Sequence, residues 1–437
     1  MKILPTVTAM LVAGALLLTG CSSGSAAGGA GSASTAGAVP TLDSNTKVTI
    51  SFMEAMSSGA QKAALAKMTQ DFMAKNPNVT VQLQEQPDYG TLQTKINAQA
   101  AAGSPPTIAQ VYGNWADEMA ASQVIVPLDA YVATSNQYPT FYNGIKRDLK
   151  LSDGKTWMWP FNKSVVVQYY NTTMIPTAPK TWDEFATVAK QVSTGNVVAI
   201  SIDPGSSTSP AGGTSWFEIL AESFGDKVFA DDGTPQFTKP GVVKALDYLV
   251  SLKKANALAL GTKYPGQAAL GNQTGAFDVS SVASYPFNLQ AVGGKFQMGV
   301  APLPAGTATT ANQLAGTDIA LFASATDQQK AAAWAYMQFL TSPDEISYWC
   351  VQTGYLPPYP DALKSPVMTD YLAKNPWVTQ VAAQLDQASP LPPKSWVNKA
   401  SGALSTAIMD AVNGTSSSTD ALTKAQAAAE KAKAEGK

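Results

Sequence analysis

Apolar and polar side chains alternate along this chain with two different periods. Residues 47–54 alternate with a period of two and are rich in β-branched side chains, which is typical of a strand. Residues 60–75 instead repeat with a helical period, and Asn76-Pro77 predicts the end of that helix. The same succession of strand and helix recurs along the chain, which favours a mostly parallel α/β sheet.

The pattern predicts further elements on both sides of residue 160. We expect strands at residues 79–83, 107–112, 156–160, 165–170, 197–202, 275–279, 296–301 and 317–322, and helices at 89–102, from 182, from 215, from 240 and at 328–340. Thr181 and Ser342 each stand three residues before a Glu, which is the spacing of a capping box at a helix start. Ligands of open α/β sheets bind at the carboxyl ends of strands, which here lead to residues 53–57 and 112–115.

The first residues have the pattern of a secretory signal. Lys2 is followed by an apolar stretch and by Leu18-Thr19-Gly20-Cys21, a run that resembles the lipobox of bacterial lipoproteins. We expect residues 1–20 to be a lipoprotein signal peptide and Cys21 to be lipidated; the alternative is an ordinary signal peptide with a chance cysteine. Residues 21–46 are mostly Ser, Gly, Ala and Thr, which predicts a flexible linker. The expected location is the extracellular face of the cell membrane, with the body held by a lipid anchor.

Composition narrows the chemistry that the chain can perform. About 400 residues follow Cys21, more than one core usually holds, so we expect two lobes. The net charge of -2 and the lack of a basic cluster argue against nucleic-acid binding. The chain has no His, and Arg147 is its only Arg, which excludes imidazole-based catalysis and leaves few guanidinium clamps for phosphate. Cys350 lies on an apolar helical face and is predicted to be a buried, inert thiol, and we expect no cofactor or metal.

An ordered set of short motifs then resembles one family, the extracellular solute-binding proteins of ABC-type carbohydrate importers, and within it the glycerol-3-phosphate binders. The motifs are Gln110-Val111-Tyr112, Pro160-Phe161-Asn162, Val167-Gln168-Tyr169-Tyr170-Asn171, Pro179-Lys180-Thr181-Trp182-Asp183-Glu184-Phe185 and Gln352-Thr353-Gly354-Tyr355-Leu356-Pro357. The resemblance implies a two-lobed α/β fold of the periplasmic-binding-protein type II class, with an interlobe hinge and a ligand cleft.

The resemblance also implies how the chain divides between the lobes. The expected allotment is residues 47–160 plus 300–327 for the first lobe and 164–298 plus 330–435 for the second. Crossings between the lobes are then expected near residues 161–164, 299–304 and 327–332.

The resemblance further implies a set of ligand-binding residues. Alignment with the glycerol-3-phosphate binders places on or beside their ligand contacts Tyr89, Ser164, Trp216, Ser281, Gly316 and Tyr355. Strand ends, the first crossing and departures from the family pattern add Asn114, Trp115, Asn162, Lys163, Asp318 and Trp396. Aromatic rings would cover the apolar face of a sugar, and polar groups would bind its hydroxyls. Trp216 could instead pack between helices. Asp318 could instead cap a helix or lie in solvent.

Two departures from the family pattern favour an uncharged ligand. Gly113 stands where the relatives have an acidic residue, and Asn398 or its neighbours stand where they have an Arg that reaches phosphate. A lost hydrogen bond to a charged group costs about 1.5–3 kcal/mol, and Lys163 is the one obvious replacement. We expect a neutral sugar or polyol; glycerol-3-phosphate or a glycerophosphodiester is the alternative ligand in the same transport role.

Other functional classes stay open at this point. A tethered glycosidase could work without His through two carboxylates, for which Glu218, Glu222 and Asp278 are candidates without a diagnostic spacing. A lipoprotein that binds sugar for a receptor is a further alternative. The favoured hypothesis is a monomeric, non-enzymatic solute receptor that partners with ABC permease subunits.

Overall fold

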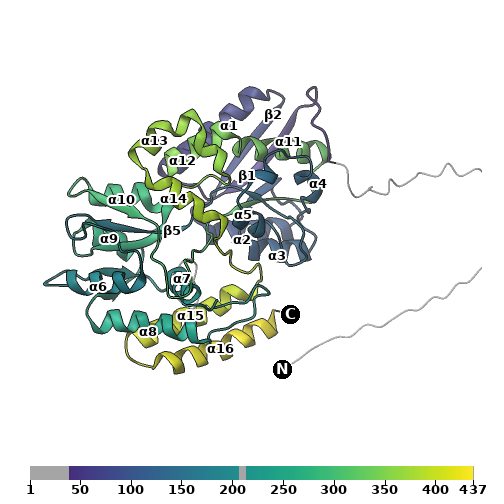
Figure 1. The fold of residues 1–437 in the computed structure, drawn as a ribbon. Helices are drawn as coiled ribbons and strands as arrows, with labels where there is room; N and C mark the ends of the chain where they lie inside the picture. The colour runs from purple at the N-terminus through teal and green to yellow at the C-terminus, as the bar shows by residue number, and fades with distance from the viewer. Residues whose placement is uncertain (1–38, 206–212, 437) are drawn as a thin grey trace, which may run out of the picture. The chain divides into compact units, whose positions relative to one another are not determined.

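The computed structural model describes residues 39–205 and 213–436, and all structural statements concern these residues. The predicted signal peptide, Cys21 and residues 21–38 of the predicted linker lie outside them. Residues 39–437 group into one compact unit that contains two five-stranded sheets. In Figure 1 the first sheet can be found by the labels of its strands β1 and β2, and the second by the label of its strand β5.

The first sheet has the strand order β2-β1-β3-β10-β4. Its strands are β1 (Val48–Glu54), β2 (Val79–Glu85), β3 (Ile108–Val111), β4 (Trp159–Pro160) and β10 (Asp318–Leu321). Strands β1, β2 and β3 are parallel, as the strand–helix order predicts, and are connected by α1 (Gly59–Lys75) and α2 (Tyr89–Ala101). Strand β10 runs antiparallel to both of its neighbours. In the sequence β10 follows all the strands of the second sheet, so local periodicity does not reveal its direction.

The second sheet has the order β7-β6-β8-β5-β9. Its strands are β5 (Val166–Asn171), β6 (Ile200–Ile202), β7 (Leu258–Leu260), β8 (Phe277–Ser281) and β9 (Met298–Ala301). Strand β6 is parallel to β7 and β8, whereas β5 is antiparallel to β8 and β9. Both sheets are therefore mixed rather than mostly parallel.

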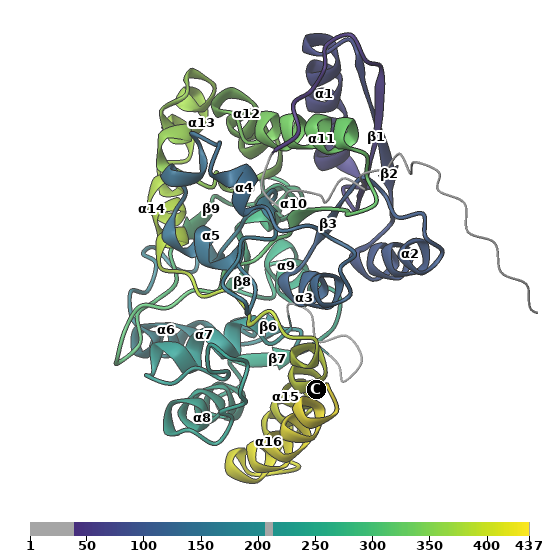
Figure 2. The same cartoon turned by 90° about the vertical axis from the view of Figure 1, so that its right-hand side faces the viewer.

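Helices make up most of the remaining chain. Around the second sheet they are α6 (Trp182–Val192), α7 (Ser215–Ser223), α8 (Pro240–Lys254), α9 (Pro265–Gly271) and α10 (Tyr285–Val292). The others are α3 (Gly113–Ala121), α4 (Asp129–Val132), α5 (Asn143–Asp148), α11 (Asp327–Leu340), α12 (Pro343–Thr353), α13 (Thr369–Lys374), α14 (Trp377–Ala383), α15 (Trp396–Val412) and α16 (Ser418–Glu435). Short 3-10 turns lie at Tyr138–Thr140, Val282–Ser284, Pro360–Lys364, Pro366–Met368 and Gln384–Asp386. Helices α15 and α16 pack along each other beside α8 (Figure 2). Among the described helices none combines the length and apolar character needed to cross a bilayer.

Two clusters of buried hydrophobic side chains underlie the two sheets. The first joins β1, β3 and β10 to α11–α14, with Trp349 and Val381 among its members. The second joins α6, α7 and α8 to α15 and α16, with Trp182 and Leu404. Cys350 is buried in the first cluster, as predicted.

This packing differs from the predicted allotment of residues 330–435 to the second lobe. Helix α11 packs on β1 and helix α12 on α1, both on the side of the first sheet, whereas α15 and α16 lie in the second cluster beside α8. Periodicity shows that a helix such as α11 has an apolar face, but it does not show which sheet that face covers.

The chain crosses between the sheets three times. The first crossing lies between β4 and β5, as predicted near residues 161–164. The second extends from β9 to β10, later than the predicted 299–304, because residues 299–301 still belong to β9. The third lies later than the predicted 327–332, because α11 still packs on β1 of the first sheet, whereas α14 contacts β9 of the second.

The two predicted capping boxes form only in part. The Thr181 side chain accepts a hydrogen bond from the Glu184 backbone, but the Glu184 carboxylate accepts from the Lys180 backbone instead of the cap residue. Ser342 makes no cap bond, since its hydroxyl donates to the Phe339 carbonyl.

Candidate ligand-binding site

Three aromatic side chains gather at the carboxyl end of β3 and the start of α2. Tyr112 follows β3, and its ring centroid lies 5.3 Å from that of Tyr89, the first residue of α2. Trp115 lies in the first turn of α3, 5.0 Å from Tyr112 and edge to face with it. We call Tyr89, Tyr112 and Trp115 the aromatic cluster. Asn114, also predicted for the site, is the half-buried neighbour of Trp115 in the same turn.

A buried amide links this cluster to the segments that cross between the sheets. The Nδ2 atom of Asn162 donates to the Tyr89 hydroxyl over 3.0 Å. Its Oδ1 atom accepts from the backbone nitrogen of Thr317 at 3.0 Å and from the Thr317 hydroxyl at 2.6 Å. Gln110 of β3 donates in turn to the Thr317 hydroxyl over 2.9 Å. Because both ends of the Asn162 amide make hydrogen bonds, its orientation is fixed.

Tyr355 joins the same group from a distant part of the sequence. It follows Gly354, which ends α12 in the left-handed conformation at φ 78°. Its ring stacks on Trp349 with a centroid distance of 5.7 Å and an interplanar angle of 11°. Burial raises the pKa of the Tyr355 hydroxyl, and hydrogen bonding with Asn162 and Tyr89 acts in the opposite direction. The structure thus brings together three predicted site residues, Tyr89, Asn162 and Tyr355.

Backbone hydrogen bonds tie the crossing segments side by side. Leu356 donates to the Lys163 carbonyl over 2.8 Å, and Ser164 exchanges two bonds with Ala315, at 3.0 and 2.9 Å. Leu314 then donates to the Ser389 carbonyl over 2.9 Å. We call the crossing segments joined by these bonds the hinge layer, because they connect the two sheets.

Three small predicted residues have structural contacts: Gly316 and Ser164 in the hinge layer, and Ser281 at a 3-10 turn. Gly316 has φ 96°, and a Cβ atom there would lie 1.8 Å from the Asn162 carbonyl oxygen, so only glycine fits. Ser164 is buried and pairs through its backbone. The Ser281 hydroxyl accepts from the Ala283 backbone nitrogen at 3.1 Å and so caps a 3-10 turn.

Lys163 and Asp318 form a buried ion cluster rather than a free cation and a free acceptor. The Lys163 ammonium has no exposed surface and lies 2.5 Å from Asp148 and 2.7 Å from Asp318. Burial disfavours the charged form of Lys163, but the two carboxylates more than offset this and raise its pKa. Burial also raises the pKa of Asp318, against the opposing effect of Lys163. The charge of Lys163 is therefore already neutralised by the protein itself.

Of the three predicted tryptophans, Trp115 belongs to the aromatic cluster, and the other two lie in packed surroundings elsewhere. Trp216 belongs to the second hydrophobic cluster, with its ring 6.0 Å from Trp182 and 5.9 Å from Phe185. Trp396 begins α15, donates to the Gly233 carbonyl over 3.3 Å, and is covered by the Lys394 ammonium at 5.6 Å. No contact joins either ring to Tyr89 or Tyr355 among the described residues.

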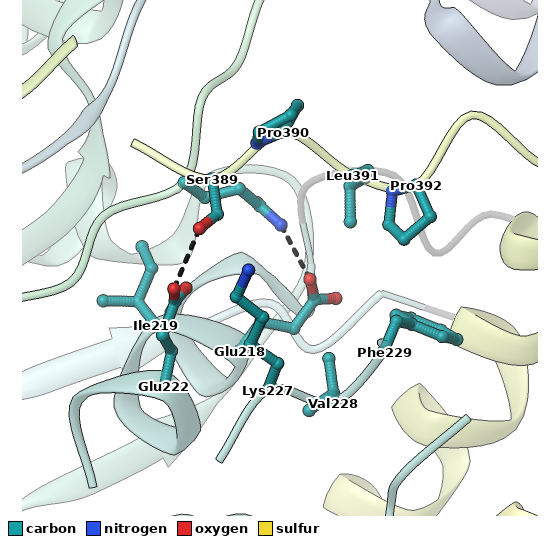
Figure 3. Close-up of a pocket in the computed structure, with 11 residues that line it drawn as sticks. Glu218, Ile219, Glu222, Lys227, Val228, Phe229, Ser389, Pro390, Leu391 and Pro392 are labelled. Atoms are coloured by element: carbon teal, nitrogen blue, oxygen red, sulfur yellow. Dashed lines mark hydrogen bonds between the residues drawn. The ribbon is translucent and has the colours of Figure 1, made fainter. Parts of the chain in front are cut away.

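A small cavity lies between α7 and the hinge layer (Figure 3). Its volume is about 40 Å³, which suits a few waters but not a sugar. Glu218 accepts from Gln313 over 2.7 Å, and Glu222 accepts from Ser389 over 2.8 Å (Figure 3). The two carboxylates of α7 thus fasten the second sheet's side of the molecule to two crossing segments.

The carboxylates considered for glycoside hydrolysis are each held by neutral donors. Burial raises the pKa of Glu218, while hydrogen bonds from Thr214 and Gln313 lower it. Asp278 in β8 accepts from Ser280 at 2.6 Å and from Asn288 at 2.8 Å, and burial raises its pKa as well.

Several residues of the site escaped the sequence prediction. Tyr112 lay at a predicted strand end, and that position was the available signal. Gln110 stands in a motif of the family resemblance, but its contact was not predicted, and Thr317 gave no signal, because the hydrogen bond between them joins residues more than 200 positions apart.

Known proteins share both sequence and fold with this chain. The sn-glycerol-3-phosphate-binding periplasmic protein UgpB of Escherichia coli K12 is 26% identical over 376 residues, which cover 79% of this chain and 82% of the relative. The cyclic alpha-maltosyl-1,6-maltose binding protein of Arthrobacter globiformis superimposes with a TM-score of 0.77 at 20% identity, covering 89% of this chain and 99% of that structure. UgpB of Mycobacterium tuberculosis, in complex with glycerophosphocholine, gives 0.76 at 20% identity, with 89% and 98% covered.

These likenesses agree with the two-sheet architecture and with the crossing segments described above. The two solved structures support the fold, and the family assignment rests on a sequence match over residues 67–376. This span contains the second sheet, every strand of the first sheet except β1, and both Asn162 and Tyr355. The chain belongs to the family of bacterial extracellular solute-binding proteins.

Proposed function

We propose that this chain is the substrate-binding lipoprotein of an ABC importer, which captures a neutral sugar or related polyol and delivers it to a membrane permease. The observation that carries the proposal is the meeting of Tyr89, Asn162 and Tyr355 at the hinge layer. Rings with hydroxyl groups and a fixed amide suit a ligand that has an apolar face and a polar rim.

The electrostatics of the site favour an uncharged ligand. Lys163, the expected phosphate donor, is buried between Asp148 and Asp318. Freeing it for a phosphate would leave two buried carboxylates without their cation, which is costly. The aromatic cluster offers neutral hydrogen-bonding groups instead, and Asn162 orients the Tyr89 hydroxyl among them.

Glycerol-3-phosphate or a glycerophosphodiester is the second candidate. The observation in its favour is Lys263, an exposed lysine next to Tyr264 at the carboxyl end of β7. The sequence relationship to UgpB supports the same alternative. Binding that weakens steeply as salt is raised would favour this candidate, because phosphate–lysine attraction is screened whereas neutral sugar binding is not.

The anchoring proposal rests on the sequence alone. Leu18-Thr19-Gly20-Cys21 supports lipidation of Cys21, and residues 21–46 would then let a monomeric body reach its permease. We further propose that the protein performs no catalysis and that the Glu218 and Glu222 carboxylates stabilise the hinge layer.

A titration experiment tests the ligand class. Isothermal titration of the purified body with maltose, maltotriose, trehalose, glycerol-3-phosphate and glycerophosphocholine should give saturable heat with at least one saccharide. Tyr355→Ala should abolish that heat, whereas Phe287→Ala, on an exposed part of α10, should preserve it. Binding of the two phosphates alone would overturn the neutral-sugar proposal and leave the transport role standing.

A further inference from the structure

Lys163 is the only lysine or arginine that is buried among the described residues. Its ammonium has no exposed surface and contacts the carboxylates of Asp148 and Asp318 at 2.5 and 2.7 Å. A side chain enclosed in this way does not reach a ligand that enters from solvent. Lys163 can therefore affect ligand binding only through the residues that it holds in place.

The backbone around Lys163 supports two tyrosines of the candidate site. Its sequence neighbour Asn162 donates to the Tyr89 hydroxyl over 3.0 Å. Its own carbonyl accepts from the backbone nitrogen of Leu356, the residue after Tyr355, over 2.8 Å. A shift of the chain at residue 163 would therefore displace the supports of both tyrosines.

Two consecutive residues of the first crossing face two consecutive residues at the start of β10. The Asn162 side chain accepts from the backbone nitrogen and the hydroxyl of Thr317, at 3.0 and 2.6 Å. The next residue on one side, Lys163, donates to the next residue on the other, Asp318, over 2.7 Å. One residue of extended chain spans about 3.3 Å, so a slip by one position would break both pairs at once.

The ion pair fixes this register more firmly than neutral hydrogen bonds do. A buried charge that loses its partner has neither water nor a counter-charge, whereas an unpaired amide loses less. Asp318 is a rigid reference point, because β10 pairs with β3 on one side and with β4 on the other. Asp148 ends α5 and is the outer carboxylate, with 16% of its side chain exposed against 2% for Asp318. The carboxylate that sets the register is therefore that of Asp318.

We propose that Lys163 is a positioning residue of the candidate site, whose ion pair with Asp318 holds the first crossing in the register that aims the Asn162 amide at Tyr89. This inference rests on the proposed function. Desolvation offsets much of the Coulomb attraction in a buried ion pair, so the pair contributes more to a unique arrangement than to the free energy of folding. Its loss should accordingly weaken ligand binding more than it destabilises the body.

A matched pair of variants tests the proposal. Asp318→Asn and Asp148→Asn each remove one carboxylate and leave Lys163 with the other, so the buried charge is the same in both variants. In calorimetric titration, Asp318→Asn should weaken binding of the saccharide that the wild type binds best at least fivefold, because Lys163 then pairs only with α5. Asp148→Asn should stay within twofold of wild type.

Hydrogen exchange of the Asn162 side-chain amide gives a second readout that needs no ligand. In protein with isotopically labelled asparagine, the nuclear magnetic resonance signal of this amide is identified by its absence from Asn162→Asp. Its exchange should be at least tenfold faster in Asp318→Asn than in Asp148→Asn. A purely structural ion pair would change the midpoint of urea unfolding and leave this exchange equal in the two variants.

The outcomes separate this inference from the proposed function. Equal affinities, or equal exchange rates, in Asp318→Asn and Asp148→Asn would overturn the inference, and saccharide binding by the wild type would leave the proposed function standing. If the wild type binds none of the five probes, the proposed function falls, and the exchange rates alone decide whether Lys163 positions Asn162.

Discussion

Asn162 connects more of the proposed site than any other single side chain. It is buried, orients the Tyr89 hydroxyl with its amide nitrogen, and binds Thr317 with its amide oxygen. Its sequence neighbour Lys163 points instead into the ion cluster with Asp148 and Asp318. Adjacent residues of one crossing segment therefore belong to separate networks, Asn162 to that of Tyr89 and Thr317, and Lys163 to the ion cluster.

Asn162→Asp tests this assignment at the residue scale. The carboxylate oxygen can still accept from Thr317, but it cannot donate to Tyr89. The free energy of ligand binding should therefore change by more than the free energy of unfolding does. Asn162→Ala should weaken ligand binding and also destabilise the fold. Its free energy of unfolding should decrease by about 1–3 kcal/mol, because the buried donors of Thr317 lose their acceptor. Urea unfolding and calorimetric titration measure the two effects. Equal affinity of wild type and Asn162→Asp would contradict the account.

Trp216→Ala should act on stability and not on binding. The ring packs with Trp182 and Phe185 in the second hydrophobic cluster, and truncation of a buried tryptophan costs about 3–5 kcal/mol. Denaturant unfolding measures this loss, and titration of the folded variant at low temperature should show affinity within about threefold of wild type. Loss of binding by the fully folded variant would restore Trp216 to the ligand site.

Glu218 makes stability depend on pH in a defined direction. Burial raises its pKa above that of the unfolded chain, so the folded state holds its proton more tightly. Its contribution to stability is greatest at low pH and is lost as pH rises from near 4.5 through the folded value. The difference in the free energy of unfolding, wild type minus Glu218→Gln, should therefore decrease as the pH rises over this range. A difference that grows in the opposite direction, or stays flat between pH 4 and 8, would contradict the burial argument.

At the scale of elements, the hinge layer decides how the two sheets are joined. It consists of short pairings between distant segments, such as Ser164 with Ala315 and Leu314 with Ser389. The carboxylates of α7 then fasten this layer from below (Figure 3). Few hydrogen bonds in a narrow layer allow one sheet to move against the other without unfolding either.

Gly316→Ala tests the packing of that layer. The added Cβ atom would lie 1.8 Å from the Asn162 carbonyl oxygen, so the crossing segments must separate. Gly414→Ala is the matched control, since Gly414 has φ 77° but nothing within 4 Å of the new atom. The control should cost about 1–2 kcal/mol from its backbone conformation alone, and Gly316→Ala should cost more and also weaken ligand binding. Equal melting temperatures of the two variants would contradict this prediction, because they would mean that the hinge layer accommodates the added methyl group.

The sequence predicted the local elements much better than their arrangement. Apolar periodicity located β1, α1 and β2 to within a few residues, because such patterns reflect which face of an element is buried. It did not reveal that β10 is antiparallel or that α11 covers the first sheet, since both depend on contacts across hundreds of residues. Family resemblance supplied Tyr89 and Tyr355, and the predicted first crossing supplied Asn162. Chemistry alone suggested a free Lys163, and only packing shows its two carboxylate partners.

At the scale of the whole molecule, the chain belongs to a family of extracellular solute-binding proteins. Anchoring by Cys21 is a separate proposal with its own test. Cys21→Ser should abolish incorporation of labelled palmitate and shift the protein from the membrane fraction to the medium. Unchanged membrane association of this variant would contradict lipidation as the means of attachment.

Ligand binding should also change the stability of the whole body. Each ligand that binds only the folded state adds RT ln(1 + [L]/Kd), about 2.7 kcal/mol at a hundredfold excess over Kd. A sugar bound between the sheets engages both of them, so unfolding of the two sheets should shift upward together.

The most direct test of the central claim is calorimetric titration of wild-type protein and Tyr355→Ala with the panel of saccharides and glycerol phosphates. The account predicts saturable, nearly salt-independent binding of at least one saccharide by wild type and none by the folded variant. Saturable binding of glycerol phosphates alone, or saccharide binding that survives in Tyr355→Ala, would contradict it.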